Sequence, residues 1–407
     1  MRLFVIDPGL HAAYGHHFIL NEMIAGECMR RAIGLEVWAA RDFVEGNERA
    51  FAARAVFRHH PYTHFRRVAD FDVLRTTALS STVTQEDLAS VATGFACGDQ
   101  FLVHTPALRQ LFGVYGWYSS LAAPRPRLAM TFRFPPWYLL EEDDRAVAVA
   151  LHAQAFRLWR SLPADEVAFA ADSRALAGLL QPAWPREIAV LPIPLSPPIE
   201  LVAPDRADGR GRLNVLFAGD ARPEKGLRLL LAILREAVAR HAHLHVTIQC
   251  ANAAPRERDL LQSRFEELQG RVSLVLEPLP LAAYHRLVAS ADALLVAYDP
   301  EQYTYRTSHV FVDALAHAKP VIYTAGSWMD GEAAALAASA GPIGPRMTSF
   351  SAAALSQALD DLVANFGPFA AAARQAAPVW RARHNISAYL DAVLGSPVAR
   401  PMESAAK

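Results

Sequence analysis

The chain has 407 residues, of which 52% are apolar and 20% charged, and its formal net charge is −1. This size and composition predict a folded protein of two domains rather than a disordered chain. A net charge near zero argues against a general nucleic-acid-binding protein, which needs a basic excess.

The three cysteines, Cys28, Cys97 and Cys250, are too few and too far apart for a disulfide framework or a zinc site. We therefore expect a reducing, cytoplasmic compartment. The first apolar run is too short for a signal peptide, and no stretch reaches the length of a membrane span. The sequence is also compatible with peripheral contact with the inner face of a membrane. It does not indicate an oligomeric state.

Apolar runs in the first half predict buried strands at residues 3–6, 35–39, 100–103, 128–132, 167–170 and 188–191. Residues 41–81, between the second and third of these strands, are polar and aromatic with little periodicity. They contain His59, His60 and His64, but no acidic residue stands at a ligand spacing. We therefore favour a surface excursion over a metal site.

Two segments of this half follow strands directly, at the edge where parallel sheets bind ligands. The loop 8–17 leads from the first strand into a predicted helix. Gly15 permits close backbone approach there, and His16 with its neighbour His17 could face a ligand. The alternative is that the paired histidines only cap a surface helix. His104 stands at the same edge, after the strand at 100–103.

Residues 192–212 are rich in proline and then in Gly, Asp and Arg, which makes them a poor strand or helix and a good linker. We divide the chain accordingly into an amino-terminal domain (1–195), a linker (196–212), a carboxyl-terminal domain (213–377) and a final segment (378–407).

The second half alternates between strands and helices. Strands are predicted at 213–218, 244–249, 272–276, 293–297 and 320–323, and helices at about 226–240, 256–268, 280–290, 308–317 and 351–365. Strict alternation predicts a parallel, doubly wound α/β sheet. Two such domains imply a cleft between them, which is the usual place for a ligand.

The loop after the strand at 213–218 carries Gly219, Arg222, Lys225 and Gly226. Only three of the chain's 40 basic residues (Lys plus Arg) are lysines, and one of them stands in this loop. A compact ammonium can reach a phosphate where a planar guanidinium would not fit. Two cations beside a helix N-terminus suit a phosphate or diphosphate. The alternative is a solvated turn before a surface helix.

A second group of polar residues follows the strand at 293–297. Ser308 is a good N-cap for the next helix, and the N–H groups beside it could hold an anion. Asp313 shares a helix face with His309 and His317 and could accept hydrogen bonds from the vicinal hydroxyls of a ribose. The alternative is a solvated helical aspartate.

Together these motifs resemble the family-4 (group 1) class of retaining glycosyltransferases, which have the GT-B fold of two Rossmann-like doubly wound domains facing across a cleft. Such enzymes carry a Gly-x5-Lys-Gly loop, then a Glu-x7-Glu pattern and a Gly-x-Pro. Here the loop runs from Gly219 to Gly226, and the second pattern runs from Tyr305 to Asp313 with Ala318-Lys319-Pro320 after it. The resemblance covers about residues 187–395 and is fainter before them.

The resemblance implies roles at the matching positions. Arg222 and Lys225 would bind the donor diphosphate and neutralise the leaving group. His104 would approach the donor sugar and the reacting centre, and Asp313 would bind the ribose. The remaining donor-binding positions are Gly15 and His16 in the opening loop, Gly219, Tyr305, and the turn at Ser308 and His309. No metal and no cofactor are implied besides the nucleotide diphosphate sugar, which is a co-substrate.

The chain also departs from the family pattern. Tyr305 replaces the first acid, the second acid is shortened to Asp313, and Ala318 replaces a glycine. Asp299 or Glu301 could supply the missing carboxylate to the sugar. The segment 378–407 resembles the helix that returns to the first domain, and we expect Trp380 to pack at that crossing.

The sequence thus predicts a glycosyltransferase that moves a sugar from a nucleotide diphosphate sugar to a hydroxyl of a glycan, glycolipid or small molecule, with retention. The alternative, kept open by Tyr305, is a catalytically impaired homologue that binds a nucleotide or glycan as a partner protein. A nucleotide-sugar epimerase has no feature to recommend it. A Rossmann oxidoreductase is less favoured because no Gly-x-Gly-x-x-Gly follows the first strand.

Overall fold

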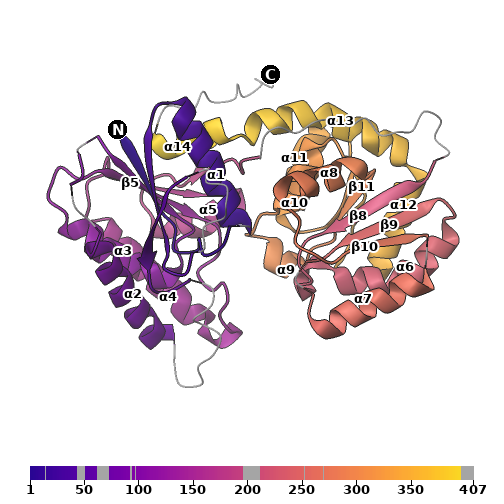
Figure 1. The fold of residues 1–407 in the computed structure, drawn as a ribbon, viewed down its shortest axis with the longest axis horizontal. Helices are drawn as coiled ribbons and strands as arrows, with labels where there is room; N and C mark the ends of the chain where they lie inside the picture. Colours follow the sequence, from indigo (N-terminus) through magenta and orange to yellow (C-terminus); the bar gives the residue numbers. More distant parts are fainter. Residues whose placement is uncertain are drawn as a thin grey trace. The chain divides into compact units, whose positions relative to one another are not determined.

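The computed structural model describes residues 1–13, 15–43, 51–61, 73–91, 94–96, 98–195, 211–251, 253–268 and 270–395. The chain divides into two compact units (Figure 1). Unit 1 comprises Met1–Pro194 and Asn385–Lys407, and unit 2 comprises Leu195–His384. Most of the expected linker, residues 196–210, lies outside the described residues.

The described part of unit 1 contains a seven-stranded sheet of order β3-β2-β1-β4-β5-β6-β7, in which all neighbours are parallel. Its strands are β1 (Arg2–Ile6), β2 (Gly34–Ala40), β3 (Ala53–Phe57), β4 (Gln100–His104), β5 (Arg127–Phe132), β6 (Val167–Ala171) and β7 (Ala189–Val190). The run from Leu3 to Ile6 is buried throughout, as expected for a strand covered on both faces. The six strands expected in this half are confirmed.

The helices of unit 1 are α1 (Gly15–Arg30), α2 (Val73–Ala89), α3 (Leu108–Ser120), α4 (Arg145–Trp159), α5 (Arg174–Leu180) and α14 (Ile386–Leu394). The prediction of a surface excursion over residues 41–81 was wrong in two places, because β3 extends the sheet and α2 packs along α3 (Figure 1). Helix α2 escaped prediction because its buried face is largely polar and includes Thr77, Ser81 and Asp87. Ser81 Oγ donates to the carbonyl of Arg109 on α3 at 2.7 Å.

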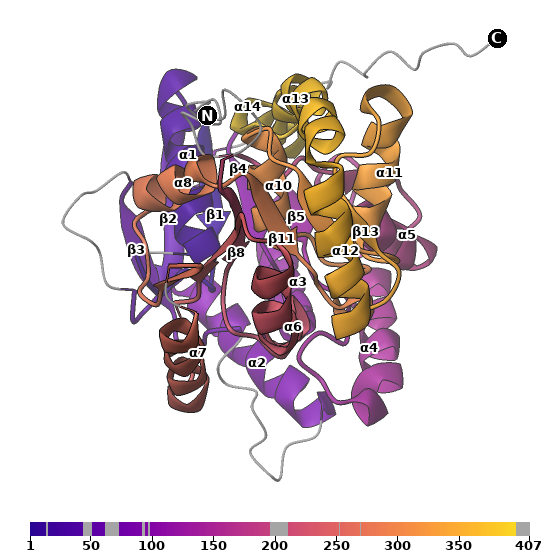
Figure 2. The same ribbon diagram turned by 90° about the vertical axis from the view of Figure 1, so that its right-hand side faces the viewer.

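The described part of unit 2 contains a six-stranded parallel sheet of order β10-β9-β8-β11-β12-β13. Its strands are β8 (Leu213–Ala218), β9 (Leu244–Gln249), β10 (Val272–Val275), β11 (Ala293–Val296), β12 (Val321–Thr324) and β13 (Arg346–Met347). Its helices are α6 (Leu227–Arg240), α7 (Pro255–Glu267), α8 (Leu281–Ser290), α9 (Pro300–Tyr303), α10 (His309–Ala316), α11 (Trp328–Ala340), α12 (Ala352–Ala364) and α13 (Phe366–Arg383). Helices α6 and α12 lie side by side against the sheet (Figure 2), and α13 packs on α10 and α11.

Both sheets reverse their strand order at one point, between β1 and β4 in unit 1 and between β8 and β11 in unit 2. Open α/β sheets bind ligands at the carboxyl ends of the strands at such a point. In unit 1 these ends carry Asp7 and His104, and in unit 2 they carry Gly219 and Ala297. The predicted pair of doubly wound, Rossmann-like α/β domains is confirmed. Among the described residues, no helix is long and apolar enough to cross a bilayer.

The final segment differs from expectation. Helix α13 continues through the predicted boundary at 377–378 and belongs to unit 2 as far as His384, and only α14 belongs to unit 1. Trp380 is 1% exposed and packs within unit 2 instead of at the crossing. Its Nε1 donates to the carbonyl of Val312 on α10 at 3.0 Å, and its ring meets Phe311 edge-on.

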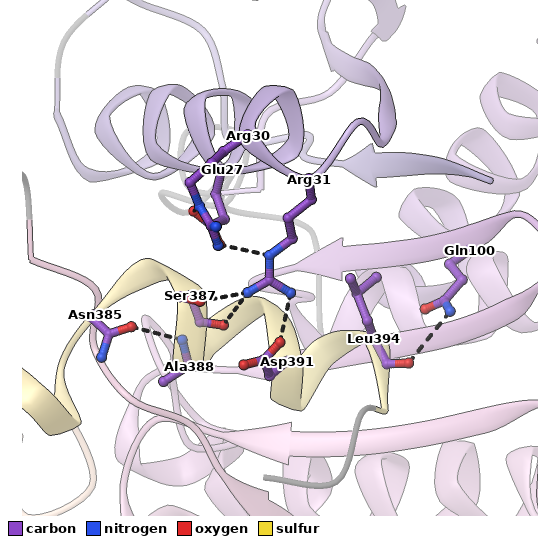
Figure 3. Close-up of polar contacts among 9 residues, drawn as sticks. All are labelled: Glu27, Arg30, Arg31, Gln100, Asn385, Ser387, Ala388, Asp391 and Leu394. Atoms are coloured by element: carbon purple, nitrogen blue, oxygen red, sulfur yellow. Dashed lines mark hydrogen bonds and ion pairs between the residues drawn. The ribbon is translucent and has the colours of Figure 1, made fainter.

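Arg31, the residue after the end of α1, binds α14 to that helix (Figure 3). Arg31 lies 2.6 Å from Asp391 Oδ1 and donates to the carbonyl of Ser387 at 2.9 Å. Glu27, one turn before Arg31 on α1, accepts from its Nε at 2.6 Å and holds the guanidinium in place. Asn385 caps α14 by accepting from the N–H of Ala388 at 2.8 Å. The last helix is therefore an integral part of unit 1.

Candidate functional site

Two glycines with positive φ shape the loop between β8 and α6. Gly219 has a φ of +131°, and its N–H donates to the carbonyl of Gln249 at 3.1 Å. Gly226 has a φ of +80°, and a Cβ at this position would lie 2.3 Å from the carbonyl oxygen of Ala297. The loop therefore lies directly against the end of β11, and no side chain fits at Gly226.

Lys225 is the buried cation of this loop, with 8% of its surface exposed. Its Nζ lies 2.7 Å from the point where a Cβ of Gly219 would be, and 5.7 Å from the ring centroid of Tyr298. Burial, and then the positive charge of Arg222, lowers the pKa of Lys225 to about 8. Because this amine is already desolvated, an anion beside it would gain a strong electrostatic attraction.

Two arginines share one carboxylate beside this lysine. Glu224 Oε1 lies 3.4 Å from Arg222 Nη1 and 3.7 Å from Arg306 Nη1. Arg306 is buried, and its guanidinium carbon lies 4.5 Å from the ring centroid of Tyr303. The sequence analysis identified Arg222 and missed Arg306, although a cation between aromatic residues in the loop after β11 was a usable signal.

The charges in this group do not balance. Asp220 lies 3.8 Å from Arg222 and is the second carboxylate of the loop, besides Glu224. Among the residues that the structure describes, Arg222, Lys225 and Arg306 thus accompany two acids, which leaves an excess of one positive charge within this group. Such an excess at the carboxyl edge of a parallel sheet suits a phosphate or diphosphate.

Ser308 is the N-cap of α10, as predicted. Ser308 Oγ accepts from the N–H of Phe311 at 3.2 Å, and His309 is the first helical residue. Tyr305 is half-buried in the preceding loop. Two acids, Asp299 and Glu301, were suggested to supply the carboxylate that Tyr305 lacks. Asp299 is half-buried and Glu301 is exposed. Asp299 caps α9 by accepting from the N–H of Glu301 at 3.0 Å, whereas the Glu301 side chain is exposed.

Asp313 is buried on α10, with 9% of its surface exposed, so the alternative of a solvated aspartate is wrong. Tyr284 on α8 donates its hydroxyl to Asp313 Oδ2 at 3.1 Å. Burial raises the pKa of Asp313 to about 7, and the bond from Tyr284 opposes that rise. His317, expected on the same face, has its Nε2 3.2 Å from Nδ1 of His285.

We expect Asp313 to make unit 2 less stable as pH rises. Its folded pKa of about 7 lies above the ordinary value of 3.8, so between these values the folded state holds a proton that the unfolded state has lost. Stability should therefore fall by on the order of 4 kcal/mol across this window. Asp313→Asn should lack this fall, because an amide oxygen still accepts from Tyr284 and does not titrate.

Urea unfolding of both proteins from pH 4 to pH 8 measures this effect. The stability of Asp313→Asn relative to the unsubstituted chain should increase with pH. Asp259→Asn, on the exposed face of α7, is the control and should show no such trend. Parallel curves for Asp313→Asn and the unsubstituted chain would contradict the prediction.

In unit 1, the carboxyl end of β1 is organised around Asp7, which is fully buried. Asp7 Oδ1 lies 2.7 Å from His17 Nδ1 and accepts from the N–H of Gly9 at 3.1 Å, and Oδ2 accepts from Asn21 Nδ2 at 2.8 Å. Burial alone would raise the pKa of Asp7, but the charge and hydrogen bonds of its partners hold it below its ordinary value. From the sequence, Asp7 was interpreted only as the residue that ends the first strand.

His104 ends β4, beside Asp7 in the sheet, and is buried. Its Nδ1 lies 3.4 Å from Thr131 Oγ1, and its Nε2 lies 3.1 Å from Thr105 Oγ1. Its ring meets that of His17 edge-on, with centroids 5.1 Å apart. Thr105 has a φ of +54°, which is rare for a β-branched residue.

The opening loop lies near this network. Gly15 begins α1, is exposed and has a φ of +80°. His16 is half-buried, and its ring lies 4.1 Å from that of His17. His60, which we placed on a surface excursion, is instead buried, and its Nε2 lies 3.2 Å from the carbonyl oxygen of Gly9. His64, the third histidine of that segment, lies outside the described residues.

Asp7, His17 and His104 place potential metal-ligand atoms within 4.8 Å of one another. The oxygens of Asp7 already interact with the Gly9 N–H, His17 and Asn21, so a metal ion would have to displace these partners. A hydrogen-bonded network accounts for the arrangement.

The two sheets and their switch points define a protein of the GT-B fold. No protein-family model matches the chain, and no curated protein sequence matches it. Solved structures do match it along almost its whole length, and three of them are described below.

One of these structures is HepE from Anabaena in complex with UDP, with 14% identity, coverage of 97% of this chain and 99% of that chain, and a TM-score of 0.64. Another is WaaG, a glycosyltransferase involved in lipopolysaccharide biosynthesis, with 14% identity, 96% and 98% coverage and a TM-score of 0.62. A UDP-forming trehalose-phosphate synthase from Burkholderia vietnamiensis matches with 12% identity, 97% and 99% coverage and a TM-score of 0.63. At these identities the likeness establishes the fold.

Proposed function

We propose that the chain is a glycosyltransferase that moves a sugar from a nucleotide diphosphate sugar to a hydroxyl of a glycan, glycolipid or small molecule. We further propose that it retains the anomeric configuration and needs no metal ion. One observation carries the proposal. A buried lysine with a lowered pKa lies at the ligand edge of unit 2, in a group with an excess of one positive charge.

The proposed roles follow from the chemistry of each group. Arg222, Lys225 and Arg306 neutralise the diphosphate as negative charge develops on the leaving group, a task that a metal ion performs elsewhere. The N–H groups at the start of α10 meet the phosphates, because Ser308 caps this helix and its N-terminus carries a partial positive charge. Asp313 accepts from a ribose hydroxyl.

For unit 1 we propose that His104 contacts the transferred sugar and that the loop with Gly15 and His16 serves the acceptor. The UDP bound in HepE leads us to expect a uridine nucleotide as the first donor to test. The cytoplasm remains the proposed compartment, because Cys28 and Cys250 are buried free thiols.

Thermal unfolding with UDP, GDP and ADP, and with the matching monophosphates, tests the donor assignment. A diphosphate at a hundred times its Kd should stabilise unit 2 by about 2.7 kcal/mol. For a unit of this size the midpoint should rise by about 5–10 °C. The monophosphates, which lack the second phosphate, should shift the midpoint much less. The donor assignment would be wrong if no diphosphate produced a shift.

Turnover is tested with the sugar conjugates of whichever nucleotide binds, followed by proton NMR of the anomeric centre. Slow release of sugar with its original configuration is the expected result, and EDTA should not change the rate. Release of the opposite anomer would contradict retention. Binding without any release would indicate the nucleotide-binding partner protein instead.

A further inference from the structure

A hydrogen bond joins helices α8 and α10 near the carboxyl edge of the sheet in unit 2. Tyr284 lies in the first turn of α8 and donates its hydroxyl to Asp313 Oδ2 on α10 at 3.1 Å. Each helix begins on the side where the parallel strands end, because α8 follows β10 and α10 follows β11. The pair therefore lies towards the same edge as Lys225 and the Ser308 cap.

The two carboxyl oxygens of Asp313 differ in what reaches them. Oδ2 accepts from Tyr284, whereas Oδ1 has no hydrogen-bond partner among the described residues. Oδ1 is also not fully enclosed by protein atoms, although the residue as a whole is buried. An ionised carboxylate can accept about four hydrogen bonds, so Oδ1 keeps its capacity for a ligand.

The charge of Asp313 depends on burial and on Tyr284. Burial raises its pKa to about 7, and the bond from Tyr284 opposes the rise. His285 and His317, which contact each other beside this pair, have pKa values lowered by burial and are neutral at pH 7. Other titratable or charged side chains on elements packed against α8 or α10 are Tyr298, His309, Lys319, Tyr323, Arg381, Arg383 and His384. Among these described groups, none adds a charge effect on the pKa of Asp313.

We propose that Tyr284 is a positioning residue for the donor nucleotide, because it binds Oδ2 of Asp313 and leaves Oδ1 to accept from a ribose hydroxyl. The phenol holds the carboxyl group in one orientation and favours its ionised form. A hydroxyl donates more strongly to a charged carboxylate than to a neutral carboxyl group. The proposal deepens the function proposed above, in which Asp313 contacts the ribose, and rests on it.

Recognition of the ribose then depends on pH. With a pKa of about 7, the ionised fraction of Asp313 rises from about a tenth at pH 6 to about nine tenths at pH 8. The part of the affinity that comes from the ribose hydroxyls should therefore rise about tenfold over this range. The phosphates and Lys225 also respond to pH, but they act equally on a nucleotide that lacks these hydroxyls.

The first test is a carbon NMR titration of the full chain labelled with ¹³C-aspartate, with the Asp313 signal assigned from the Asp313→Asn variant. We expect the carboxyl carbon of Asp313 to titrate near pH 7. Tyr284→Phe keeps the ring and removes the donor, so it should raise the pKa of Asp313 by about one unit. Ser290→Ala is the matched control, because it removes a hydroxyl of the same helix that donates to the carbonyl of Leu287 at an exposed site.

A second change at the same position acts in the opposite direction and keeps the hydroxyl. Incorporation of 3-fluorotyrosine at position 284 provides a more acidic phenol and a stronger donor, so it should lower the pKa of Asp313. The control of Asp313 by Tyr284 is overturned if neither change moves this pKa, or if both move it in the same direction.

The second test compares UDP with 2′,3′-dideoxy-UDP by titration calorimetry at pH 6, 7 and 8, or the corresponding pair for whichever base binds. The ratio of the two affinities should favour UDP and should grow about tenfold from pH 6 to pH 8. Tyr284→Phe should lower this ratio about fivefold at pH 7 and leave the affinity for the dideoxy analogue unchanged. Asp313→Asn should remove the dependence of the ratio on pH, and Ser290→Ala should change none of these values.

The two tests separate a failure of this inference from a failure of the proposed function. If UDP binds and Tyr284→Phe leaves the ratio unchanged, the donor assignment stands and the positioning role is overturned. If no nucleoside diphosphate binds, the proposed function and the ribose contact fail together. The carbon titration then still decides whether Tyr284 controls the charge of Asp313.

Discussion

Replacing Lys225 by methionine should weaken binding of a nucleoside diphosphate by about 30- to 1000-fold, equivalent to about 2–4 kcal/mol. The loss is large because the amine is buried, lies next to Gly219 and belongs to a group with excess positive charge. Binding of the corresponding monophosphate should change much less, since the second phosphate makes the lost contact. Titration calorimetry with UDP and UMP, or with the pair that binds best, measures both effects.

The same substitution should make the ligand-free protein more stable. The pKa of Lys225 is lowered to about 8 from an ordinary 10.5, so between these values the unfolded state binds a proton that the folded state has lost. Stability should therefore rise with pH across that window in the unsubstituted chain, and Lys225→Met should lack the rise. At pH 7, methionine removes the cost of holding a desolvated charge, and the melting temperature should increase.

Arg228→Met is the control for both measurements. Arg228 lies on α6, the helix that follows the loop, and its exposed side chain is 3.6 Å from Glu257 on α7. It should alter neither affinity nor stability by more than about 0.5 kcal/mol. A Lys225→Met protein that is destabilised and binds the diphosphate normally would show that the lysine only supports the loop.

Replacing Trp380 by alanine should lower the free energy of unfolding of unit 2 by about 3–5 kcal/mol. The indole is 1% exposed, meets Phe311 and donates to the carbonyl of Val312, so its removal leaves a cavity between α13 and α10. Because α10 carries Asp313 and begins at the Ser308 cap, nucleotide affinity should fall as well. Urea unfolding followed by circular dichroism and by nucleotide binding gives both numbers.

Two variants on the same helix separate packing from the hydrogen bond. Trp380→Phe keeps most of the ring contact and should cost about 1–2 kcal/mol. Val379→Ala changes a side chain that is 66% exposed and should have no measurable effect. Equal losses for alanine and phenylalanine at position 380 would mean that the indole N–H, rather than the volume of the ring, holds α13 on α10.

The sheets were predictable because strands of a parallel sheet are covered on both faces and stand out as apolar runs, as Leu3 to Ile6 and Leu213 to Ala218 do. Other elements lack this signal. Helix α2 buries Thr77, Ser81 and Asp87, and α11 is composed largely of alanine, so neither has an apolar period. In α2, a hydrogen bond from Ser81 and a close backbone approach to α3 at Gly113 replace apolar burial.

The residues of the candidate site differ in how far their local sequence reveals them. Lys225 was recognisable because lysine is rare in this chain and follows a strand. Arg306 was not, since its partner Glu224 is distant in sequence and only the fold brings the two side chains together. At position 318 the backbone keeps a conformation that suits glycine although the residue has changed. Ala318 replaces a glycine of the family pattern and still adopts a φ of +58°.

Helix α14 has a consequence for how the protein is made. Tyr389, Leu390 and Val393 complete the core of unit 1, but they are synthesised after all of unit 2. At about 5–20 residues per second, the roughly 190 residues of unit 2 keep a ribosome occupied for about 10–40 s after the rest of unit 1 has emerged. During that time the nascent amino-terminal sheet exposes the apolar surface that α14 will cover. A stop codon after His384 would remove α14 and leave this surface uncovered permanently.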